Sequence, residues 1–301
     1  MRFHHSQFLD IGKLLDLKQG QKISVCIPTL NEAATIGQIV STIHDSLVRK
    51  SQLVDEILVI DSGSTDHTRE IAAAAGAKVY LSAEILPGQA SYIGKGENLW
   101  KALHISHGDI ICYIDGDISD FHSGFITGLV GPLLTNREID YVKAYYERPL
   151  NQAGEIQPNG GGRVSEILAR PLISLFYPQL HEILQPLAGE YAARRSTLES
   201  LAFPIGYGVE IAHLIDLARD GKLYRIAQTD LVKRTHRNRS DKELGSMAFS
   251  ILKVVLRRLE RDGKLSLANP IPDLYQSWAI DGEIIRAVSK SIPEPERPPK
   301  I

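Results

Sequence analysis

The sequence predicts an α/β protein with a Rossmann-like, mostly parallel sheet covered by helices on both faces. Two observations carry this prediction. Strand-like and helix-like segments alternate along residues 22–117, and the strand-like segments are runs of apolar and β-branched residues. The chain has 301 residues, of which 43% are hydrophobic, so it is long enough to bury a substantial core.

The elements are expected in a regular order. Strands are predicted at 22–30, 55–64, 78–82 and 109–117, and helices at 35–48, 65–76 and 96–108. In the helix at 65–76, Asp66 is the candidate N-cap and Gly76 is the expected end. Parallel sheets bind their ligands outside the carboxyl ends of the strands, so a site is expected at that edge.

Polar segments follow three of these strands. The first strand ends in PTLNE (28–32), the second in DSGSTD (61–66), and the fourth runs into YIDGDISD (113–120). One polar loop is ordinary, but three at one edge favour a binding site. Asp115 and Asp117 are expected in water or against a cation, because an ionised carboxylate is costly to bury without a partner.

The common glycine-rich nucleotide loops do not fit this chain. The segment GKGENL (94–99) lacks the third glycine and the preceding strand of a dinucleotide fingerprint, and the sequence contains no P-loop. An anion at this edge would then need a divalent metal to carry its charge. Mg²⁺ and Mn²⁺ prefer oxygen ligands and commonly bridge a carboxylate to a diphosphate. Asp115 and Asp117 suit that role, and a solvated acidic turn is the plainer alternative.

Composition limits the partners and the location. With 34 Lys+Arg and 36 Asp+Glu the net charge is -2, so no overall basic field predicts a nucleic-acid or anionic-membrane partner. No apolar run approaches the roughly 20 residues of a membrane span, and acidic and polar residues interrupt the start of the chain. We expect a cytoplasmic protein in which Cys26 and Cys112 are reduced, buried thiols.

Several segments resemble those of GT-A glycosyltransferases. PTLNEAATIG, DSGSTD and DGD, in this order and at these strand ends, are similar to the nucleotide-binding half of that fold, whose Asp-x-Asp holds the metal of a nucleoside-diphosphate sugar. The segments LPGQASYIGKGENLWKAL, GGGRVSEILARPL, LQPLAGEYAARR, GYGVEI and RTHRNR are more specific. They resemble the glucosyl-3-phosphoglycerate synthases and their mannosyl-transferring relatives over residues 22–240.

The resemblance implies a retaining enzyme that moves glucose from UDP-glucose to 3-phosphoglycerate with Mg²⁺ or Mn²⁺ as cofactor. It implies donor contacts from Pro28, Leu30, Glu32, Ser62, Lys95, Asp115, Gly116 and Asp117, with Lys95 beside the diphosphate. Asp117 and His236 would hold the metal. Gly162, Arg163, Ser165, Arg234 and Asn238 would bind the acceptor. The candidate catalytic residues are Asp117, Lys95 and Glu210, the last of which would position the sugar or stabilise an oxocarbenium-like state.

Elementary chemistry agrees with parts of this assignment. Lys95 precedes a predicted helix start at Gly96, and helix N-termini favour anions. Three glycines precede Arg163, so the backbone there can approach a ligand closely. A basic cluster surrounds His236 in a chain of net charge -2, and an anionic acceptor would use it.

We divide the chain into four parts. These are a nucleotide-sugar-binding half (1–150), an acceptor-binding half of the same domain (151–240), a C-terminal helical extension (241–290) and a disordered tail (291–301). The extension rests on amphipathic patterns at 242–263 and 276–290, which we expect to pack on the core or in a homodimer rather than on a membrane. The tail, IPEPERPPKI, is proline-rich and charged.

Three alternatives stay open. The chain could be a mannosyl-3-phosphoglycerate synthase that uses GDP-mannose, because donor selectivity depends on pocket shape. A transferase with a polyprenyl-phosphate acceptor is a second, although such enzymes often carry apolar anchors and this sequence has none. A non-catalytic sugar-nucleotide sensor is the third, although it would be expected to lose metal or acceptor residues that are present here.

Overall fold

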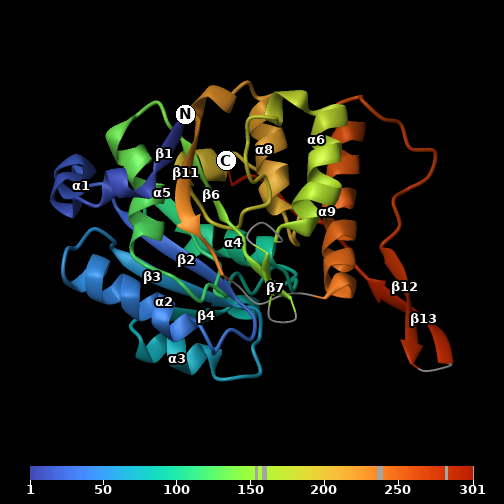
Figure 1. Ribbon diagram of the computed structural model, residues 1–301, viewed down its shortest axis with the longest axis horizontal. Coiled ribbons are helices and arrows are strands. Elements are labelled where there is room, and N and C mark those ends of the chain that lie inside the picture. The colour runs from blue at the N-terminus through green and yellow to red at the C-terminus, as the bar shows by residue number, and fades with distance from the viewer. Residues whose placement is uncertain (153–154, 158–160, 236–239, 282–283, 301) are drawn as a thin grey trace.

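A mixed sheet forms the centre of the molecule (Figure 1). The computed structural model describes residues 1–300 except 153–154, 158–160, 236–239 and 282–283. In these residues eight strands form one sheet in the order β1, β11, β6, β9, β5, β2, β3, β4. Their bounds are β1 Arg2–His4, β2 Ile23–Thr29, β3 Glu56–Asp61, β4 Lys78–Leu81, β5 Ile110–Tyr113, β6 Tyr141–Glu147, β9 Tyr191–Arg194 and β11 Ile226–Lys233.

The sheet is mostly parallel, as predicted. Strand β9 is the exception among these eight, because it runs antiparallel to both of its neighbours, β5 and β6. The other neighbouring pairs are parallel. The carboxyl ends of β2, β3, β5, β6 and β11 therefore meet at one edge, and the amino end of β9 lies there too.

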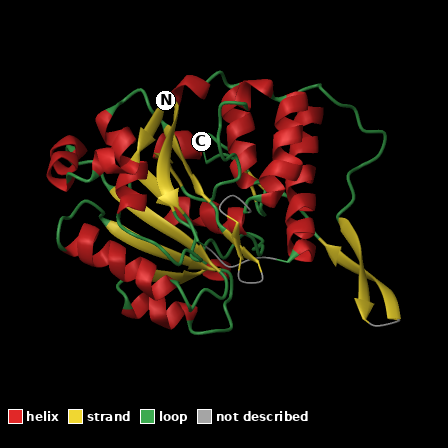
Figure 2. Ribbon diagram, viewed as in Figure 1, coloured by secondary structure: helices red, strands yellow, loops and turns green. Residues whose placement is uncertain are grey.

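Helices cover both faces of the sheet (Figure 2). They are α1 Ile11–Lys18, α2 Ile36–Ile43, α3 Thr68–Ala74, α4 Lys95–Ile105, α5 Gly124–Thr135, α6 Arg170–Phe176, α7 Arg195–Glu199, α8 Val209–Arg219 and α9 Asp241–Arg261. Short 3₁₀ or π segments are η1 His5–Phe8, η2 His44–Arg49, η3 Ser82–Glu84, η4 Ser165–Ala169, η5 Pro178–Leu180 and η6 Leu223–Arg225. Small strands are β7 Leu150–Gln152, β8 Glu155–Gln157 and β10 Phe203–Pro204.

Alternate residues of the central strands point to opposite faces of the sheet and belong to two separate hydrophobic cores. Val25 and Ile27 of β2 pack with α1, α2 and α5, whereas Cys26 packs on the opposite face with α4, α6, α8 and α9. A strand that is buried on both faces must be apolar throughout, which is why these strands read as continuous apolar runs. Cys26 and Cys112 are free and buried, as predicted.

The predicted elements of the first half are confirmed, with shifted ends. Strands β2 to β5 and helices α2 to α4 lie at the predicted places, and η2 continues α2 to Arg49. Helix α3 begins later than expected, because His67 and not Asp66 occupies the cap position. The Asp66 carboxylate accepts a hydrogen bond from the Thr68 N–H at 3.1 Å. Gly76 follows the end of α3 with φ of 106°, a conformation that suits glycine.

The predicted helical extension is helical only in its first part. Helix α9 confirms the pattern at 242–263, but the predicted helix at 276–290 is wrong: β12 (Leu274–Asp281) pairs antiparallel with β13 (Ile284–Ser291). Only Gly-Glu separates these two strands in the sequence, and a two-residue connection that begins with glycine is a hairpin signal that outweighs the helical period. Figure 1 shows this hairpin projecting from the body beyond α9.

The prediction of a disordered tail is also wrong for residues up to Lys300. Strand β14 (Glu296–Arg297) pairs antiparallel with β10, and the side chains of Glu294 and Arg297 are buried. The charges that made this segment look disordered have partners in the body of the molecule. The division of the chain at residues 150 and 240 remains a prediction, and one sheet runs through both parts. No helix among the described residues is both long and apolar enough to cross a membrane.

Candidate active site

A cavity of about 250 Å³ lies at the carboxyl edge of the sheet, within the described part of the chain. It is reached by segments that follow β2, β5, β6 and β11 and by the first turns of α4 and α8. The predicted site residues that line it are Pro28, Leu30, Glu32, Lys95, Asp115, Gly116, Asp117, Gly162, Arg163, Ser165, Glu210 and Arg234. The fold therefore gathers segments that are far apart in the sequence. Their individual roles remain predictions.

Two predicted site residues, His236 and Asn238, lie outside the described residues. Ser62 is described but is not part of the cavity wall. Its hydroxyl accepts a hydrogen bond from the Asn98 amide at 2.8 Å, and Asn98 does line the cavity. The predicted donor contact of Ser62 remains a prediction.

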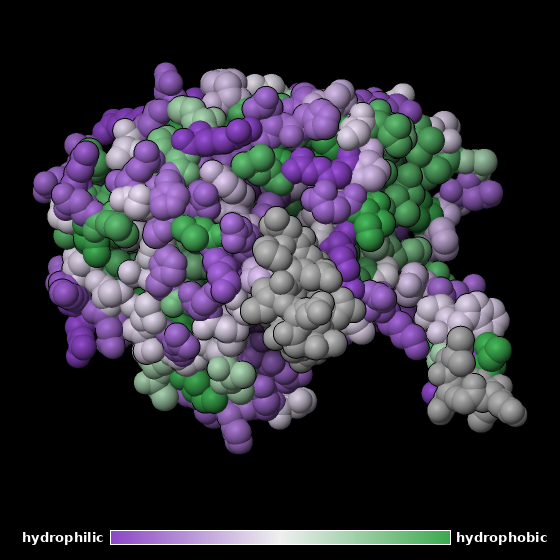
Figure 3. Space-filling view, viewed as in Figure 1, coloured by the Kyte–Doolittle hydropathy of each residue, from purple (hydrophilic) through white to green (hydrophobic). Residues whose placement is uncertain are grey.

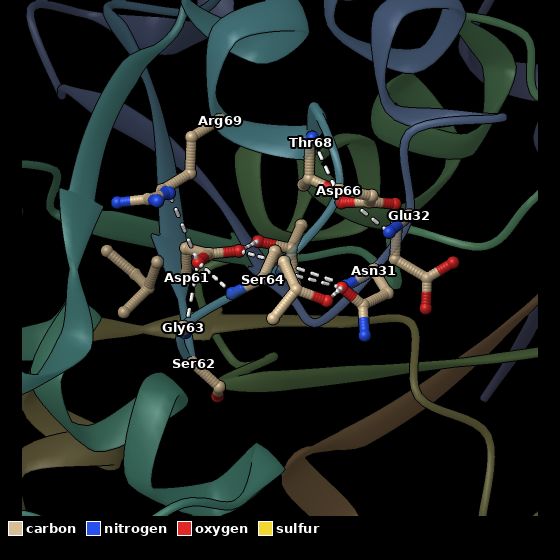
Figure 4. Close-up of polar contacts among 12 residues, drawn as sticks. Asn31, Glu32, Asp61, Ser62, Gly63, Ser64, Asp66, Thr68 and Arg69 are labelled. Carbon is tan, nitrogen blue, oxygen red and sulfur yellow. Dashed lines mark hydrogen bonds and ion pairs between the residues drawn. The ribbon is translucent and has the colours of Figure 1, made fainter.

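A buried polar network fixes the loops that follow β2 and β3 (Figure 4). The Asp61 carboxylate is fully buried and accepts hydrogen bonds from the Thr29 hydroxyl at 2.9 Å and from the Ser64 N–H at 2.7 Å. The Glu32 N–H donates to the Thr68 hydroxyl at 2.8 Å, while the Glu32 side chain points away from the network in Figure 4. The polar side chains of DSGSTD thus have a structural role, because they hold the PTLNE loop at the cavity.

The Asp-x-Asp turn rests against the end of β2 and the loop that follows it. The Thr35 hydroxyl donates to the Gly116 carbonyl at 2.6 Å. A Cβ at Gly116 would lie 3.1 Å from Cγ2 of Thr29, so there is little room for a larger residue. The turn places Asp115 and Asp117 outside β5, which ends at Tyr113. The prediction that the pair sits where the strand emerges is confirmed.

Lys95 joins two carboxylates from different elements. Its Nζ lies 2.5 Å from Oδ1 of Asp115 and 2.8 Å from Oε1 of Glu210. Burial alone would lower the pKa of Lys95, but the nearby charges of Asp115, Glu210 and Glu190 outweigh burial and raise the pKa above its ordinary value. Lys95 therefore carries a positive charge. A Cβ at Gly189 would lie 2.2 Å from Oδ2 of Asp115, so a larger residue there would displace this ion pair.

Arg234 is held by three carboxylates. Its Nη2 donates to Oδ2 of Asp115 at 3.0 Å and to Oδ1 of Asp117 at 2.7 Å, and its Nε lies 3.0 Å from Oε1 of Glu190. Burial would lower the pKa of Arg234, but Glu190 and the other acidic neighbours raise it well above its ordinary value. Arg234 is a permanent cation that neutralises the aspartate pair. Its predicted contact with the acceptor is a further role that these distances leave untested.

Glu190 was missed by the sequence reasoning. It is fully buried, and it accepts a hydrogen bond from the Tyr146 hydroxyl. Burial raises the pKa of Glu190, and the charge of Arg234 opposes that rise. Glu190 comes directly before β9, which was not predicted, and only an antiparallel β9 brings its amino end to the cavity edge. The sequence signal from which Glu190 could have been predicted is Gly-Glu (189–190) directly before the short run YAA (191–193).

Lys143 on β6 was missed as well. It is fully buried, its Nζ donates to the Ala188 carbonyl, and this nitrogen lies 5.1 Å from the centre of the Tyr191 ring. Burial is the main reason that its pKa is lowered to about 7, and the positive charge of Lys95 contributes while Glu210 opposes the shift. A lysine behind the carboxylate cluster therefore titrates near neutral pH.

The helix N-terminus at Gly96 does not serve as the expected anion site. The N–H of Gly96 donates to the Gly206 carbonyl at 3.2 Å, and the N–H of Glu97 donates to the Ile205 carbonyl at 3.0 Å. A Cβ at Gly96 would lie 1.8 Å from the Pro204 carbonyl oxygen. The glycines of GKG therefore allow a second backbone segment to approach. An interaction of this region with a phosphate would depend on the Lys95 side chain.

The predicted acceptor segment turns at Gly162, whose φ of 79° is a conformation that favours glycine. Beyond the turn, Ser165 begins η4 and is buried, whereas Arg163 is partly exposed and forms an ion pair with Asp241 at the start of α9. The turn, η4 and α9 thus form one wall of the cavity. A small anion that binds Arg163 would compete with the Asp241 carboxylate.

The residues present suit a divalent cation. Four carboxylates of the site are joined by ion pairs to two cations, Lys95 and Arg234; they are Asp115, Asp117, Glu190 and Glu210. The carboxylate oxygens are the kind of donor that Mg²⁺ and Mn²⁺ prefer. Among the described residues no three His, Cys, Asp or Glu side chains are arranged to hold a metal by themselves. A further ligand would have to come from elsewhere, and His236 is the predicted one.

The chain is similar to known glycosyltransferases. The sequence model described as glycosyl transferase family 2 matches residues 24–178. The glucosyl-3-phosphoglycerate synthase of Petrotoga mobilis is 51% identical over 301 residues, which cover 99% of this chain and 93% of that protein. The enzyme of the same name from Mycolicibacterium smegmatis is 43% identical and covers 96% of this chain and 92% of its own length.

Solved structures agree with the sequence comparison. A crystal structure of the glucosyl-3-phosphoglycerate synthase of Mycobacterium tuberculosis with Mn²⁺, UDP-glucose and phosphoglyceric acid has a TM-score of 0.86 and is 40% identical, covering 99% of this chain and 97% of that one. A structure of that enzyme with Mg²⁺ and UDP has a TM-score of 0.86 at 39% identity, with the same coverage. The fold is the GT-A glycosyltransferase fold. The chain belongs to glycosyl transferase family 2 and, within it, to the glucosyl-3-phosphoglycerate synthases.

Proposed function

We propose that this protein transfers glucose from UDP-glucose to 3-phosphoglycerate and so produces glucosyl-3-phosphoglycerate. The observation that carries the proposal is that one cavity is lined both by the Asp-x-Asp turn with Lys95 and by the Gly162–Ser165 turn with its arginine. The first set suits a metal-bound diphosphate and the second suits a small anion. The relative of known structure binds UDP-glucose and phosphoglyceric acid together.

Mg²⁺ or Mn²⁺ would be held by Asp117 and by His236, the latter lying outside the described residues. When bound, the metal supplies positive charge to the diphosphate of the donor. Lys95 contributes a second, permanent positive charge beside Asp115. Negative charge develops on the diphosphate as the glycosidic bond breaks, so a cation fixed in this position stabilises the leaving group.

Glu210 faces the same cavity from the start of α8, and its carboxylate is fixed by Lys95 at 2.8 Å. A buried carboxylate that is held in place either orients the sugar hydroxyls or stabilises positive charge at the anomeric carbon. In retaining glycosidases a carboxylate attacks that carbon. Here the ion pair with Lys95 lowers the nucleophilicity of Glu210, which favours the positioning and electrostatic roles.

The acceptor would be held at the turn before η4. Arg163, with a forked cationic group, and Ser165, with a hydroxyl, both line the cavity. Arginine binds phosphates and carboxylates with two parallel hydrogen bonds, and both groups occur in 3-phosphoglycerate. Arg234 and Asn238 complete the proposed acceptor set.

We also propose that the protein forms a homodimer in the cytoplasm. Apolar side chains are exposed on η4 and α6, where Ile167 is 76% and Leu175 is 72% exposed, and on the hairpin, where Trp278 is 65% exposed. Figure 3 shows apolar surface over the α6 and α9 region and the hairpin standing out beside it. A two-stranded hairpin is marginally stable by itself in water. A second copy that covers these surfaces would stabilise the hairpin.

The activity is tested with purified protein, 3-phosphoglycerate and Mg²⁺, by following nucleotide release from UDP-glucose, GDP-glucose and GDP-mannose in separate reactions. We expect release from UDP-glucose and a phosphorylated glucosyl product. Release from GDP-mannose alone would replace the proposed donor. The dimer is tested by light scattering on the wild type and on Trp278→Ser, for which we expect a shift toward monomer.

A further inference from the structure

The C-terminal segment, residues 292–300, lies behind two elements of the active site. Strand β14 of this segment pairs with β10, and the Ile205 N–H donates to the Pro295 carbonyl at 3.1 Å. None of its residues lines the cavity described above. It contacts the segment that leads into α8 and the start of α4, which carry Glu210 and Lys95, and it also contacts side chains of α9.

Glu294 fastens the segment that leads into α8. Its carboxylate is 2% exposed and accepts hydrogen bonds from the Gly206 N–H at 3.1 Å and from the Ser250 hydroxyl. A Cβ at Gly206 would lie 2.1 Å from Oε1 of Glu294, so the carboxylate packs directly on the backbone. The position of residues 205–206 is therefore set from the C-terminal side.

Arg297 fastens the start of α4. Its Nε and Nη2 donate to the two oxygens of Glu97 at 2.7 and 2.6 Å, and Glu97 is fully buried. The guanidinium lies over the rings of Trp100 and Tyr92, with its central carbon 4.7 and 5.0 Å from their centres. This is a bidentate charge pair with two aromatic walls, a geometry that lysine cannot reproduce.

The two fastened elements meet at the catalytic ion pair. Glu97 lies two residues after Lys95 in the first turn of α4, and its N–H donates to the Ile205 carbonyl at 3.0 Å. Residues 205–206 continue directly into α8, which carries Glu210. The Lys95–Glu210 contact of 2.8 Å joins the same two elements on the cavity side. The C-terminal segment thus supports the Lys95–Glu210 pair from the side opposite the cavity.

We propose that Arg297 is a positioning residue for glucosyl transfer. Through its contact with Glu97, Arg297 keeps Lys95 and Glu210 in their correct relative positions. This inference rests on the proposed function for the roles of those two residues. Small displacements of groups that contact the reacting atoms reduce turnover strongly, whereas substrate affinity depends on more distributed contacts. Loss of Arg297 should therefore lower kcat more than it raises either KM.

The experiment compares the wild type with Arg297→Ala, Arg297→Lys and the control Lys300→Ala, all as full-length protein. Lys300 lies in the same segment and forms a partly exposed ion pair with Glu199 at 3.0 Å. For Arg297→Ala we expect kcat to fall roughly 10- to 100-fold, with both KM values within about threefold of wild type. Methylguanidinium should restore part of kcat by filling the site between Trp100 and Tyr92.

Hydrogen–deuterium exchange gives a second readout that does not depend on the substrate. Protection of residues 93–98 and 204–210 should fall in Arg297→Ala and recover with methylguanidinium, and it should not change in Lys300→Ala. If Arg297→Ala does not fold, the same two measurements on Arg297→Lys test the inference, and the expected fall in kcat is smaller. Exchange still tests the bracing if the wild type transfers no glucose, a result that would reject only the proposed function. A folded Arg297→Ala with wild-type kcat and unchanged exchange would overturn the inference.

Discussion

The Asp120 carboxylate accepts two hydrogen bonds from Thr235, one from its N–H and one from its hydroxyl, each at 2.9 Å. The Ser119 N–H donates to the Thr235 carbonyl at 3.0 Å in the opposite direction. These contacts join the loop that carries Asp117 to the loop that carries Arg234. Asp117 lies three residues before Asp120, and Arg234 directly precedes Thr235. Thr235 also directly precedes His236, the second predicted metal ligand.

Asp120→Ala should therefore weaken metal binding although Asp120 is not itself a predicted ligand. Groups that orient metal ligands typically contribute about 10- to 100-fold to metal affinity, and we expect a loss in this range. The measurement is Mn²⁺ affinity in the presence of UDP, by electron paramagnetic resonance. Thr235→Val, which removes only one of the two hydrogen bonds, should have a smaller effect. Wild-type Mn²⁺ affinity in Asp120→Ala would show that the join between the loops is unimportant for the metal.

Asp117→Ala should lower kcat/KM by about 100-fold or more, close to 3 kcal/mol of transition-state stabilisation. The carboxylate lies on a loop beyond β5, so the fold should survive. Its removal leaves the buried Arg234 with one acidic partner fewer, and a modest fall in Tm is the expected side effect. Steady-state kinetics with and without EDTA test the prediction. Normal turnover in this variant would take Asp117 out of the mechanism.

The sequence predicted the part of the fold in which each strand is followed by its own helix. Strands β2 to β5 were found because strands buried on both faces are apolar throughout. Strand β9 was not found, because it is short and its pairing with β5 and β6 depends on contacts far away in the sequence. The hairpin was mistaken for a helix, since Trp278, Ile285 and Val288 recur at helical spacing.

The same reasoning explains what was found of the site. Residues that follow the predicted strands, such as Asp115 and Asp117, could be placed at one edge from sequence alone. Glu190 and Lys143 could not, because the first depends on the direction of β9 and the second lies inside a strand that was not predicted. The bracing by Arg297 was hidden in a segment whose composition is typical of disorder.

Lys143 should make stability depend on pH above neutrality. Its pKa is lowered from 10.5 in the unfolded chain to about 7 in the folded protein. Between these values the unfolded state binds more protons, so this group makes the folded state more stable as pH rises. Below about pH 7 both states are protonated and its contribution is constant. The slope is at most about 1.4 kcal/mol per pH unit.

Lys143→Met removes this titration. The free energy of unfolding of the wild type, relative to that of the variant, should rise between pH 7 and pH 9 and stay level between pH 5 and pH 6. Urea denaturation at each pH gives the two free energies. A difference that does not change with pH from 5 to 9 would mean that Lys143 keeps an ordinary pKa in the folded protein.

Arg163→Ala should impair the use of the acceptor and leave the donor unaffected. Charge-assisted hydrogen bonds contribute about 1.5 to 3 kcal/mol each, so the KM for 3-phosphoglycerate should rise roughly 10- to 100-fold. Asp241→Asn is the matched variant, because it removes a carboxylate that competes for Arg163 and leaves the arginine in place. Its acceptor KM should equal or fall below that of wild type.

Glycerate, which lacks the phosphate, should be a poor acceptor for the wild type. That penalty should shrink in Arg163→Ala, because the group that binds the phosphate is gone. A wild type that uses glycerate and 3-phosphoglycerate equally well would reject the acceptor assignment and would leave the sugar-nucleotide part of the site unaffected.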